Sequence, residues 1–566
     1  GARDSEAAFF RIAPSLGERE YLQTVFRELT RLPAAAPLFD REHNLVWRLG
    51  PSAEGCKQLL QLFRAPHPDA PAFRFGQPDT RFLGDLYQDL DDGVRERFAL
   101  LQTPDFVESF ILDRTLEPAI REYGIDHTDL IDPTCGSGHF LLGAFNRIYD
   151  HLRRAHPGWN DRKLAAETLE RIHGVDINPY AVSIARFRLT LQFLESGGYD
   201  RLLSNTPAPV LRVIVADSLY YGFAGGQGDL AERPDQTPEQ TAAWLGSNFS
   251  LEDPEAARQI LVKKTYAAVV GNPPYITVKD PVLREFYRQH YTAAAGKYAL
   301  SAPFMQRFFQ LAKGGGGFVG QITSNSFTKR EFGVPLVEKV LPSLDLELIV
   351  NAAGACIPGH GTPTVLVFGR NRPPSSDHVD AVLAKHGEPR VPSDPAQGQV
   401  WRSIVEHWNE AGFENDFVSV AALERSQLGV HPWSLAGGGA SSLKLMIEQS
   451  NSTRLEHITA AIGFDAIMGE DDIYIGPPGW AKRLALDPKH IRSLCTGEDI
   501  RDWRLSTPLS VVFPYDRGLT ASPPTGSTLV DAHFWQFRTN LANRQQFGKD
   551  TLEAGLEWYE YRSFYK

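Results

Sequence analysis

The stretch LIDPTCGSGHFLLGAFNRIYDHL (residues 130–152) passes from a short apolar strand through a glycine-rich turn into an amphipathic helix. The turn therefore lies at the carboxyl edge of a predicted sheet and at a helix N-terminus, which is the usual place for a nucleotide-like ligand. Glycines lack a Cβ atom, so the backbone can approach a ligand closely. Roughly half of such turns are only tight loops, so this turn alone does not identify a cofactor site.

Short apolar runs, each followed by a turn and a helical pattern, repeat along the chain from residue 130 onward. This alternation predicts an α/β domain with a mostly parallel sheet, because parallel strands are joined by helical crossovers. Seven strands are predicted, at residues 130–131, 172–175, 213–215, 267–270, 318–322, 346–350 and 365–368.

The second and third predicted strands end in acidic residues. Asp176-Ile177 follows the second strand in GVDINP, and Asp217-Ser218 follows the third in ADS. A carboxylate at the second tip can accept both ribose hydroxyls of a nucleoside, and one at the third suits an adenine amine. Each Asp alone is equally well explained as a helix cap or a turn residue. Three Asp residues at successive strand tips are hard to explain in that way. Asp176 follows Asp132 by 44 residues, not by the roughly 20 of a nicotinamide site, which disfavours a dehydrogenase.

The fourth predicted strand runs directly into Asn272-Pro273-Pro274-Tyr275. Prolines stiffen the turn and carry no N–H, so backbone carbonyls can point into a cleft. The Asn272 side-chain oxygen and the Pro273 carbonyl offer two acceptors to one amine. An aromatic amine is a poor nucleophile because its lone pair is delocalised, and two acceptors localise that pair toward a methyl donor. Tyr275 offers a flat face for a base. The alternative is a rigid turn after a strand.

With the glycine-rich turn and the acidic strand tips upstream of NPPY, the chain resembles the amino-methylating DNA methyltransferases with the gamma order of motifs. Thr103-Pro104-Asp105-Phe106 with Phe110 resembles the upstream cofactor segment of that family, and Lys297-Tyr298 resembles its segment after the catalytic loop. Longer stretches resemble the adenine methylases of BREX and phage-growth-limitation defence systems and of DISARM systems. These stretches are GNPPYITVKD (271–280), SAPFMQRFFQLA (301–312), ITSNSFTKREFG (322–333), CIPGHGTPTVLVFGR (356–370) and TGEDIRDWRL (496–505).

The resemblance implies S-adenosylmethionine as the cofactor, no metal, and double-stranded DNA and other phage-defence proteins as partners. It implies that the catalytic residues are Asn272, Pro273, Pro274 and Tyr275. It also implies that the cofactor-binding residues are Thr103, Phe110, Asp132, Pro133, Thr134, Gly136, Ser137, Gly138, Asp176, Ile177, Asp217, Ser218 and Asn272. Phe327 and Phe332 are candidates for a second aromatic that stacks on the base, or they belong to the core.

The chain divides into three predicted parts. Residues 1–100 form a helical N-terminal region, and residues 101–400 form the catalytic domain, with a polar insertion at about 224–260. Residues 401–566 form a C-terminal DNA target-recognition region, which we expect to be incomplete. The boundary before it falls in the proline-rich stretch 370–400. Trp and Tyr interleaved with Arg and Lys favour DNA recognition there; a lid or an oligomer interface is the alternative.

The composition is that of a globular protein, with 42% hydrophobic and 22% charged residues. The four cysteines form no CxxC pair, which argues against disulfides or a zinc site and fits a reducing bacterial cytoplasm. No apolar run reaches the ~18 residues of a membrane span. The net charge of −11 argues against a protein that coats nucleic acid, so DNA binding requires a local basic cleft. The opening Gly and the end at EWYEYRSFYK lead us to expect a fragment.

These features predict a site-specific DNA methyltransferase that acts on the N6 amine of a flipped adenine. Neither Cys135 nor Cys356 has the setting of a thiolate that attacks a cytosine ring. Methylation of a protein glutamine stays open, since that class shares the NPPY loop, although the long C-terminal region argues against it. A recognition subunit that is active only with partners is a second alternative. A nuclease is unsupported, because the N-terminal part has no PD…ExK pattern.

Overall fold

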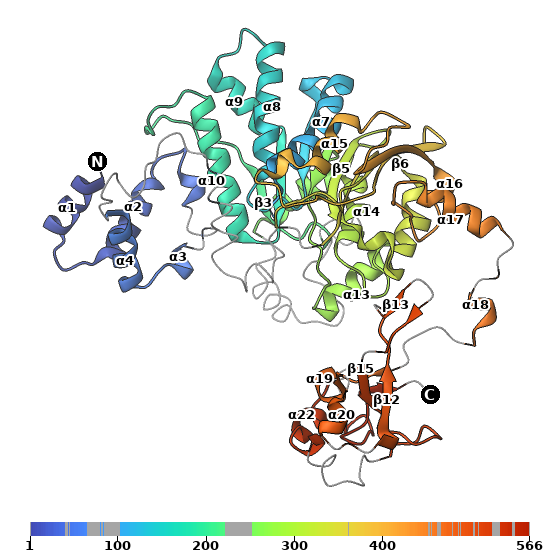
Figure 1. The fold of residues 1–566 in the computed structure, drawn as a ribbon. Coiled ribbons are helices and arrows are strands. Elements are labelled where there is room, and N and C mark those ends of the chain that lie inside the picture. Colours follow the sequence, from blue (N-terminus) through green and yellow to red (C-terminus); the bar gives the residue numbers. More distant parts are fainter. Residues whose placement is uncertain are drawn as a thin grey trace. The chain divides into compact units, whose positions relative to one another are not determined.

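The computed structural model describes residues 2–39, 44, 46–64, 80, 83, 102–220, 252–359 and 362–450 and, with short gaps, 453–564. The chain forms two compact units, residues 1–446 and 447–566 (Figure 1). Most of the predicted insertion lies outside the described residues. Its end forms α12 (Pro254–Arg258) and the π-helical turn η4 (Gln259–Lys263).

The larger unit is built on a nine-stranded, mostly parallel sheet. In sheet order the strands are β3 (Arg212–Val215), β2 (Ile172–Asp176), β1 (Leu130–Asp132), β4 (Ala268–Gly271), β5 (Phe318–Ser324), β7 (Thr364–Arg370), β6 (Asp345–Asn351), β8 (His378–Ala384) and β9 (Val418–Glu424). The first five strands in this order, from β3 to β5, are all parallel to their neighbours in that group, and β6 is parallel to β8. β7 is antiparallel to both neighbours, and β9 is antiparallel to β8. The strand order reverses between β1 and β4, and a ligand site is expected at the carboxyl ends there.

Helices cover both faces of this sheet (Figure 1), and each face has its own hydrophobic core. Adjacent residues of β1 enter opposite cores, because side chains alternate along a strand: Leu130 joins one and Ile131 the other. One core includes α7 (Asp105–Tyr123), α8 (His139–Ala155), α9 (Asp161–Leu169), α10 (Pro179–Ser196) and α15 (Gln399–His407). The other includes α12, η4, α13 (Pro281–His290), α14 (Ser301–Leu311), the turns η5 (Asn325–Thr328), η6 (Glu331–Gly333), η7 (Leu336–Val340) and η8 (Leu341–Ser343), and α16 (Arg425–Leu428).

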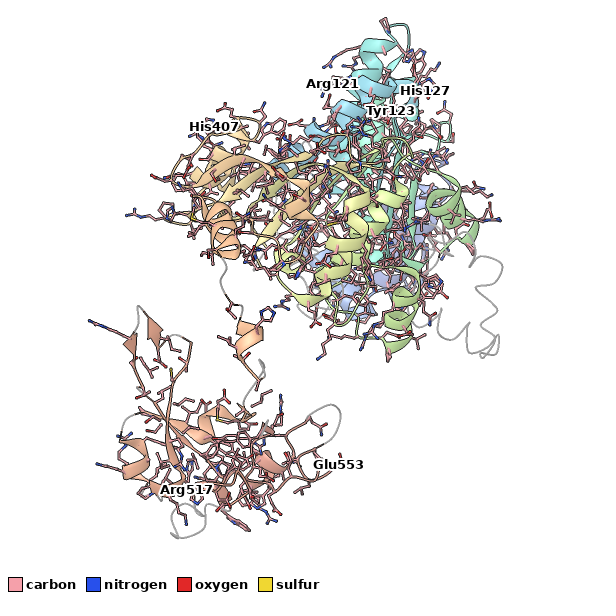
Figure 2. The ribbon with its side chains drawn as sticks, turned by 90° about the vertical axis from the view of Figure 1, so that its right-hand side faces the viewer. Arg121, Tyr123, His127, His407, Arg517 and Glu553 are labelled. Carbon is pink, nitrogen blue, oxygen red and sulfur yellow. The ribbon has the colours of Figure 1, made fainter. Side chains whose placement is uncertain are left out.

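The C-terminal end of α7 lies at the edge of the sheet where β5 begins. Arg121, Tyr123 and His127 mark this end (Figure 2). The Tyr123 ring packs edge-on against Phe318, the first residue of β5, with the ring centroids 6.4 Å apart. Because β4 and β5 are parallel, this edge is the one opposite to their carboxyl ends.

The predicted α/β class and the mostly parallel sheet are confirmed, and all seven predicted strands are present as β1 to β7. The predicted strand number is two too few, because β8 and β9 extend the sheet. β8 lies within 370–400, so the boundary predicted there is wrong and the compact unit runs to residue 446. In β8 the exposed His378 and Asp380 alternate with the buried Val379 and Ala381. This pattern is a strand signal, which the prolines on either side obscure.

The described N-terminal residues are helical. They form α1 (Ala2–Ile12), α2 (Glu18–Leu29), η1 (Ala36–Leu38), α3 (Val46–Leu49) and α4 (Ala53–Arg64). In the part of the chain that the structure describes, no helix combines the length and the apolar character that crossing a bilayer requires.

The second unit consists of short elements around an aromatic core. Its antiparallel pairs are β11 (Ile475–Gly476), β15 (Leu509–Val512) and β12 (Ile491–Leu494) in one sheet, β10 (Ala466–Ile467) with β16 (Ser563–Phe564), and β13 (Ile500–Arg501) with β14 (Arg504–Leu505). Its helices are α18 (Leu455–Ile458), α19 (Asp471–Tyr474), α20 (Trp480–Arg483), η10 (Pro488–His490) and α22 (Arg538–Ala542), and α17 (Ala440–Gln449) spans the division. The buried Arg544 donates to the carbonyls of Met468, Trp558 and Glu560, and so joins three segments of this unit.

Candidate active site

A pocket opens at the carboxyl ends of β1 and β4, where the strand order reverses. Its walls come from the glycine-rich turn, the tips of β2 and β3, the loop after β4, and α13 and α14. The predicted site residues that line it are Thr103, Asp132, Pro133, Thr134, Gly136, Ser137, Asp176, Ile177, Asp217, Ser218, Asn272 and Pro274. Residues not predicted as contacts are Gln102, Cys135, His139, Phe140, Ala181, Ala216, Leu219, Tyr287, Leu300 and Phe304.

The glycine-rich turn folds around the Asp132 carboxylate. Asp132 Oδ1 accepts the backbone N–H of Thr134 at 2.9 Å and its hydroxyl at 3.2 Å. Burial raises the pKa of Asp132 to about 8, and the nearby Asp176 adds to this increase. Gly136 has a φ of +50°, and a Cβ atom there would meet nothing within 4 Å. The turn therefore presents a buried carboxyl group and an open stretch of backbone to a ligand.

Asp176 ties the second strand tip to this turn. Its Oδ2 accepts the backbone N–H of Gly136 at 2.9 Å, and its Oδ1 accepts that of Asn178 at 2.8 Å. Burial raises the pKa of Asp176, while these two hydrogen bonds lower it. Asn178 in turn caps α10, because its Oδ1 accepts the backbone N–H of Tyr180 at 3.0 Å.

Asp217 and Ser218 bring the third strand tip to the same pocket. The Ser218 hydroxyl donates to the Pro133 carbonyl at 2.7 Å, which joins the third tip to the first. Asp217 Oδ1 accepts the backbone N–H groups of Leu219 and Tyr220 at 2.9 and 3.1 Å. Three carboxylates from three successive strand tips therefore line one cavity.

β4 delivers Asn272 into this cavity, and Gly271 makes its close approach possible. A Cβ atom on Gly271 would lie 2.6 Å from Asp132 Oδ1 and 2.9 Å from Thr134 Oγ1. Any side chain there would push the strand away from the glycine-rich turn. The fourth strand tip thus lies directly beside the first.

The rest of the catalytic loop is braced by the segment before α14. Pro274 lines the pocket with Asn272, whereas Pro273 is buried and Tyr275 half-buried outside the lining. The N–H of Leu300 donates to the Ile276 carbonyl at 2.8 Å, next to an antiparallel bridge between Thr277 and Ala299. The loop is therefore held by the segment that leads into α14.

Two predicted cofactor residues do not reach the pocket wall. Phe110 is 3% exposed and lies in the core, where its ring centroid is 5.4 Å from that of Trp401. Gly138, with a φ of +87°, begins α8, and a Cβ there would lie 3.0 Å from the Cβ of Ala185. Both positions serve packing in this structure.

The two candidates for a second stacking aromatic are also buried. Phe327 and Phe332 are 1% and 8% exposed and belong to the core on the α14 side. The Phe327 ring packs edge-on against Trp433 at 5.5 Å. Neither ring lines the pocket.

Half of the ten lining residues that motif reasoning missed lie in helices. Leu300 and Phe304 are four residues apart at the start of α14, so they share one helix face. Tyr287 lies one turn before the end of α13. The helical period can group such residues, but which face meets the pocket depends on how α13 and α14 pack on the sheet.

Four exposed cations lie in segments that follow the catalytic loop, brace it, or follow the neighbouring strand. Lys279 follows the loop, Lys297 precedes α14 in the bracing segment, and Lys329 and Arg330 follow β5, the neighbour of β4. Within the described ranges no ion pair to any of the four occurs. We call these four residues the loop cations; they form a local basic group on a chain of net charge −11.

Comparison with known proteins shows similarity to DNA-modifying methylases. A family model described as the Eco57I restriction-modification methylase matches residues 170–355. The adenine-specific methyltransferase PglX of Streptomyces coelicolor is 40% identical, over 97% of this chain and 47% of that protein. The adenine-specific methyltransferase BrxX of Escherichia coli O9:H4 is 24% identical, over 35% of this chain and 21% of that protein.

A similar fold occurs in the Type IIL restriction-modification enzyme MmeI, solved in complex with DNA. The match has a TM-score of 0.50 at 12% identity and covers 85% of this chain and 59% of that one. The chain spans about half the length of PglX. The resemblance that the motifs predict is confirmed, and the chain is a relative of the adenine-specific methyltransferase PglX along nearly all of its own length.

Proposed function

We propose that the chain is a site-specific DNA methyltransferase that transfers a methyl group from S-adenosylmethionine to the N6 amine of an adenine. The observation that carries this proposal is that Asn272 and Pro274 line the same pocket as three strand-tip carboxylates. A methyl donor and an acceptor amine can therefore meet in one cavity. The similarity to PglX and BrxX, whose names state adenine specificity, supports adenine as the acceptor.

The pocket lining fits S-adenosylmethionine. This ligand presents hydroxyl and N–H donors and carries positive charge. Asp132 and Asp217 are buried acceptors of negative or potentially negative charge, and Asp176 is a partly buried one. Asp176 would hold the ribose hydroxyls and Asp217 the adenine amine. The other predicted lining residues would complete the site: Thr103, Pro133, Thr134, Gly136, Ser137, Ile177 and Ser218. When bound, the ligand supplies an electrophilic methyl group on a sulfonium.

The catalytic loop activates the acceptor amine. The Asn272 side-chain oxygen and the Pro273 carbonyl accept its two hydrogens, which localises the nitrogen lone pair toward the methyl group. Tyr275 stacks on the base, which must leave the duplex to reach a buried donor. No enzyme nucleophile takes part. Cys135 lines the pocket, but burial raises the pKa of its thiol, which keeps it from acting as a thiolate.

The remaining parts of the chain would bind DNA. The loop cations, which lie in the segments around the catalytic loop, would bind the phosphates on either side of a flipped base, since phosphate contacts require such charges. The second unit, residues 447–566, would contribute to recognition of the target sequence. The enzyme would mark host DNA in the bacterial cytoplasm, together with other proteins of a phage-defence system.

Transfer of a labelled methyl group tests this function. The purified chain is incubated with labelled S-adenosylmethionine and unmethylated host DNA, and nucleosides are analysed after digestion. N6-methyladenine is expected, and it should be absent with Asn272→Ala. Label in protein would favour the glutamine reaction instead. Label in DNA only after addition of host extract would show dependence on partners, and label at cytosine would contradict the choice of base.

A further inference from the structure

Tyr287 holds the carboxylate at the third strand tip. Its hydroxyl donates a hydrogen bond to Asp217 Oδ2. The tyrosine is 4% exposed and lines the pocket. It lies on α13, which begins at Pro281, a few residues after the catalytic loop, and belongs to none of the motifs above. All three carboxylates have hydrogen-bond partners in or next to the strand-tip turns, and Asp217 has in addition this partner from a separate helix.

The bonds already made to Asp217 leave little room for a ligand. A carboxylate has about four lone-pair sites. The N–H groups of Leu219 and Tyr220 use two on Oδ1, at 2.9 and 3.1 Å, and the Tyr287 hydroxyl uses one on Oδ2. One site on Oδ2 remains. A single acceptor matches a single N–H of an amine, not a pair of hydroxyls.

Two further side chains, from the residue that follows α13 and from α14, donate hydrogen bonds to the backbone next to Asp217. The Tyr291 hydroxyl donates to the Leu219 carbonyl at 2.8 Å. Arg307 of α14 donates through Nε to the Ser218 carbonyl at 3.0 Å. The loop after β3 is therefore fixed by α13 and α14, and Tyr287 is the contact that determines the direction of the free carboxylate oxygen.

We propose that Tyr287 is a positioning residue for the cofactor, which holds Asp217 so that its one remaining acceptor site meets the exocyclic amine of the cofactor's adenine. The inference rests on the proposed function, because it assumes an adenosine ligand. It also connects the cofactor site to the helix that follows the catalytic loop, so the two halves of the pocket share one structural element.

The Tyr287 bond also favours the acceptor form of Asp217. Burial raises the pKa of Asp217, and the bonds from Tyr287, Tyr220 and Leu219 lower it. Without the phenol, the carboxyl group takes up a proton at a higher pH and loses acceptor capacity there. The affinity of the variant for cofactor should therefore fall earlier on acidification. The other titratable groups around this site are Tyr291, Tyr298, Arg307, Asp132, Cys135, His139 and Asp176. All of them are unchanged in Tyr287→Phe, so a difference between its pH profile and that of the wild type is due to the loss of the phenol.

Calorimetric titration with S-adenosylhomocysteine tests the proposal. Tyr287→Phe should weaken binding about fivefold to tenfold at neutral pH, with a larger loss on acidification. Tyr291→Phe is the matched control, because it removes a buried tyrosine hydroxyl that lies directly after the same helix and bonds to the same loop. It should change binding by less than about twofold.

Equal losses in the two variants would overturn the proposal, since Tyr287 would then only hold the loop in shape. An unchanged affinity and pH profile in Tyr287→Phe would overturn it as well. In an Asp217→Asn background, Tyr287→Phe should have little further effect on binding, and an additive loss would contradict action through the carboxylate. If the wild-type chain binds no S-adenosylhomocysteine, the proposed function fails instead. If the wild-type chain binds S-adenosylhomocysteine and Tyr287→Phe binds it equally well, the positioning role of Tyr287 fails while the proposed function stands.

Discussion

The cofactor side and the acceptor side of the pocket are built in different ways. On the cofactor side, Asp132 and Asp217 are buried and Asp176 is partly buried. Asp132 and Asp217 accept N–H and O–H donors, and Asp176 accepts two backbone N–H groups. On the acceptor side, the loop 272–275 offers neutral oxygens from one amide side chain and a proline-stiffened backbone, braced through Ile276 and Thr277. Buried carboxylates respond to pH and to the charge of a ligand, whereas neutral acceptors respond to geometry alone. Substitutions on the two sides should therefore separate cofactor binding from methyl transfer.

Asn272→Ala should produce the largest separation. Loss of one of two preorganised acceptors should lower the rate of methyl transfer by about 10²–10³-fold or more. Cofactor affinity should stay within a few fold, because the three carboxylates are unchanged. Single-turnover transfer and S-adenosylhomocysteine titration measure the two effects. Asn371→Ala is a control in the same unit, because its side chain bonds to the Ala312 carbonyl and does not line the pocket. Loss of cofactor binding in Asn272→Ala would mean that Asn272 belongs to the cofactor side.

Asp176→Ala should give the complementary result. Removing a carboxylate that takes ribose hydroxyls should weaken cofactor binding by about 1.5–3 kcal/mol, or roughly tenfold to 150-fold. Transfer at saturating cofactor should fall much less. Asp394→Ala is the control, since it removes an Asp that accepts a backbone N–H at 3.0 Å in an exposed turn away from the pocket. An unchanged cofactor affinity in Asp176→Ala would show that Asp176 does not bind the cofactor and only connects the two turns.

The same contrast explains how far the sequence predicts the site. Asp132, Asp176, Asp217 and Asn272 are adjacent in sequence to strand ends with glycine or proline signals, and parallel strands bring such ends to one edge. Tyr287 and Phe304 carry no local signal, because their orientation depends on the packing of α13 and α14. The motif resemblance places Phe110 at the cofactor, but its face of α7 meets Trp401 in the core.

The fold shows a similar limit. β1 to β7 follow the alternation of strands and helices, while the strand pattern of β8 lies between proline-rich turns. In the second unit, the described strands have two to four residues. Strands of that length are too short for a hydrophobic period to be visible, so their pairing depends on contacts between distant segments.

The pH dependence of cofactor binding should follow Asp132. Its carboxyl group has a pKa of about 8 in the free protein, and a cationic ligand favours the carboxylate. Affinity for S-adenosylmethionine, whose sulfonium is positively charged, should therefore rise with pH by up to about tenfold per unit and level off near pH 8. Stability of the free protein should change in the opposite direction. Because the folded-state pKa lies above the ordinary value of 3.8, stability is lost as pH rises from about 4 to about 8.

Asp132→Asn should flatten both profiles. Calorimetric titration and thermal unfolding across this pH range measure them. The substitution leaves Asp176 and Asp217 in place, so a pH dependence that persists unchanged would assign the proton to one of those two carboxylates. On the acceptor side, Asn272→Ala should leave the profile as it is in the wild type.

The smallest expected effect concerns the surface beside the acceptor side, where the loop cations lie. Lys279→Ala and Lys329→Ala should each lower the slope of log K against log salt for DNA binding by about 0.9, and weaken binding to all sequences alike. Arg121→Ala is the control, because this exposed residue lies on α7 at the edge of the sheet remote from the pocket (Figure 2). Equal changes in all three variants would show a general effect of charge. Four cations account for a total slope of log K against log salt of about 3 to 4. If the slope measured for the whole chain is steeper, the remaining phosphate contacts come from other basic residues, including those of the second unit.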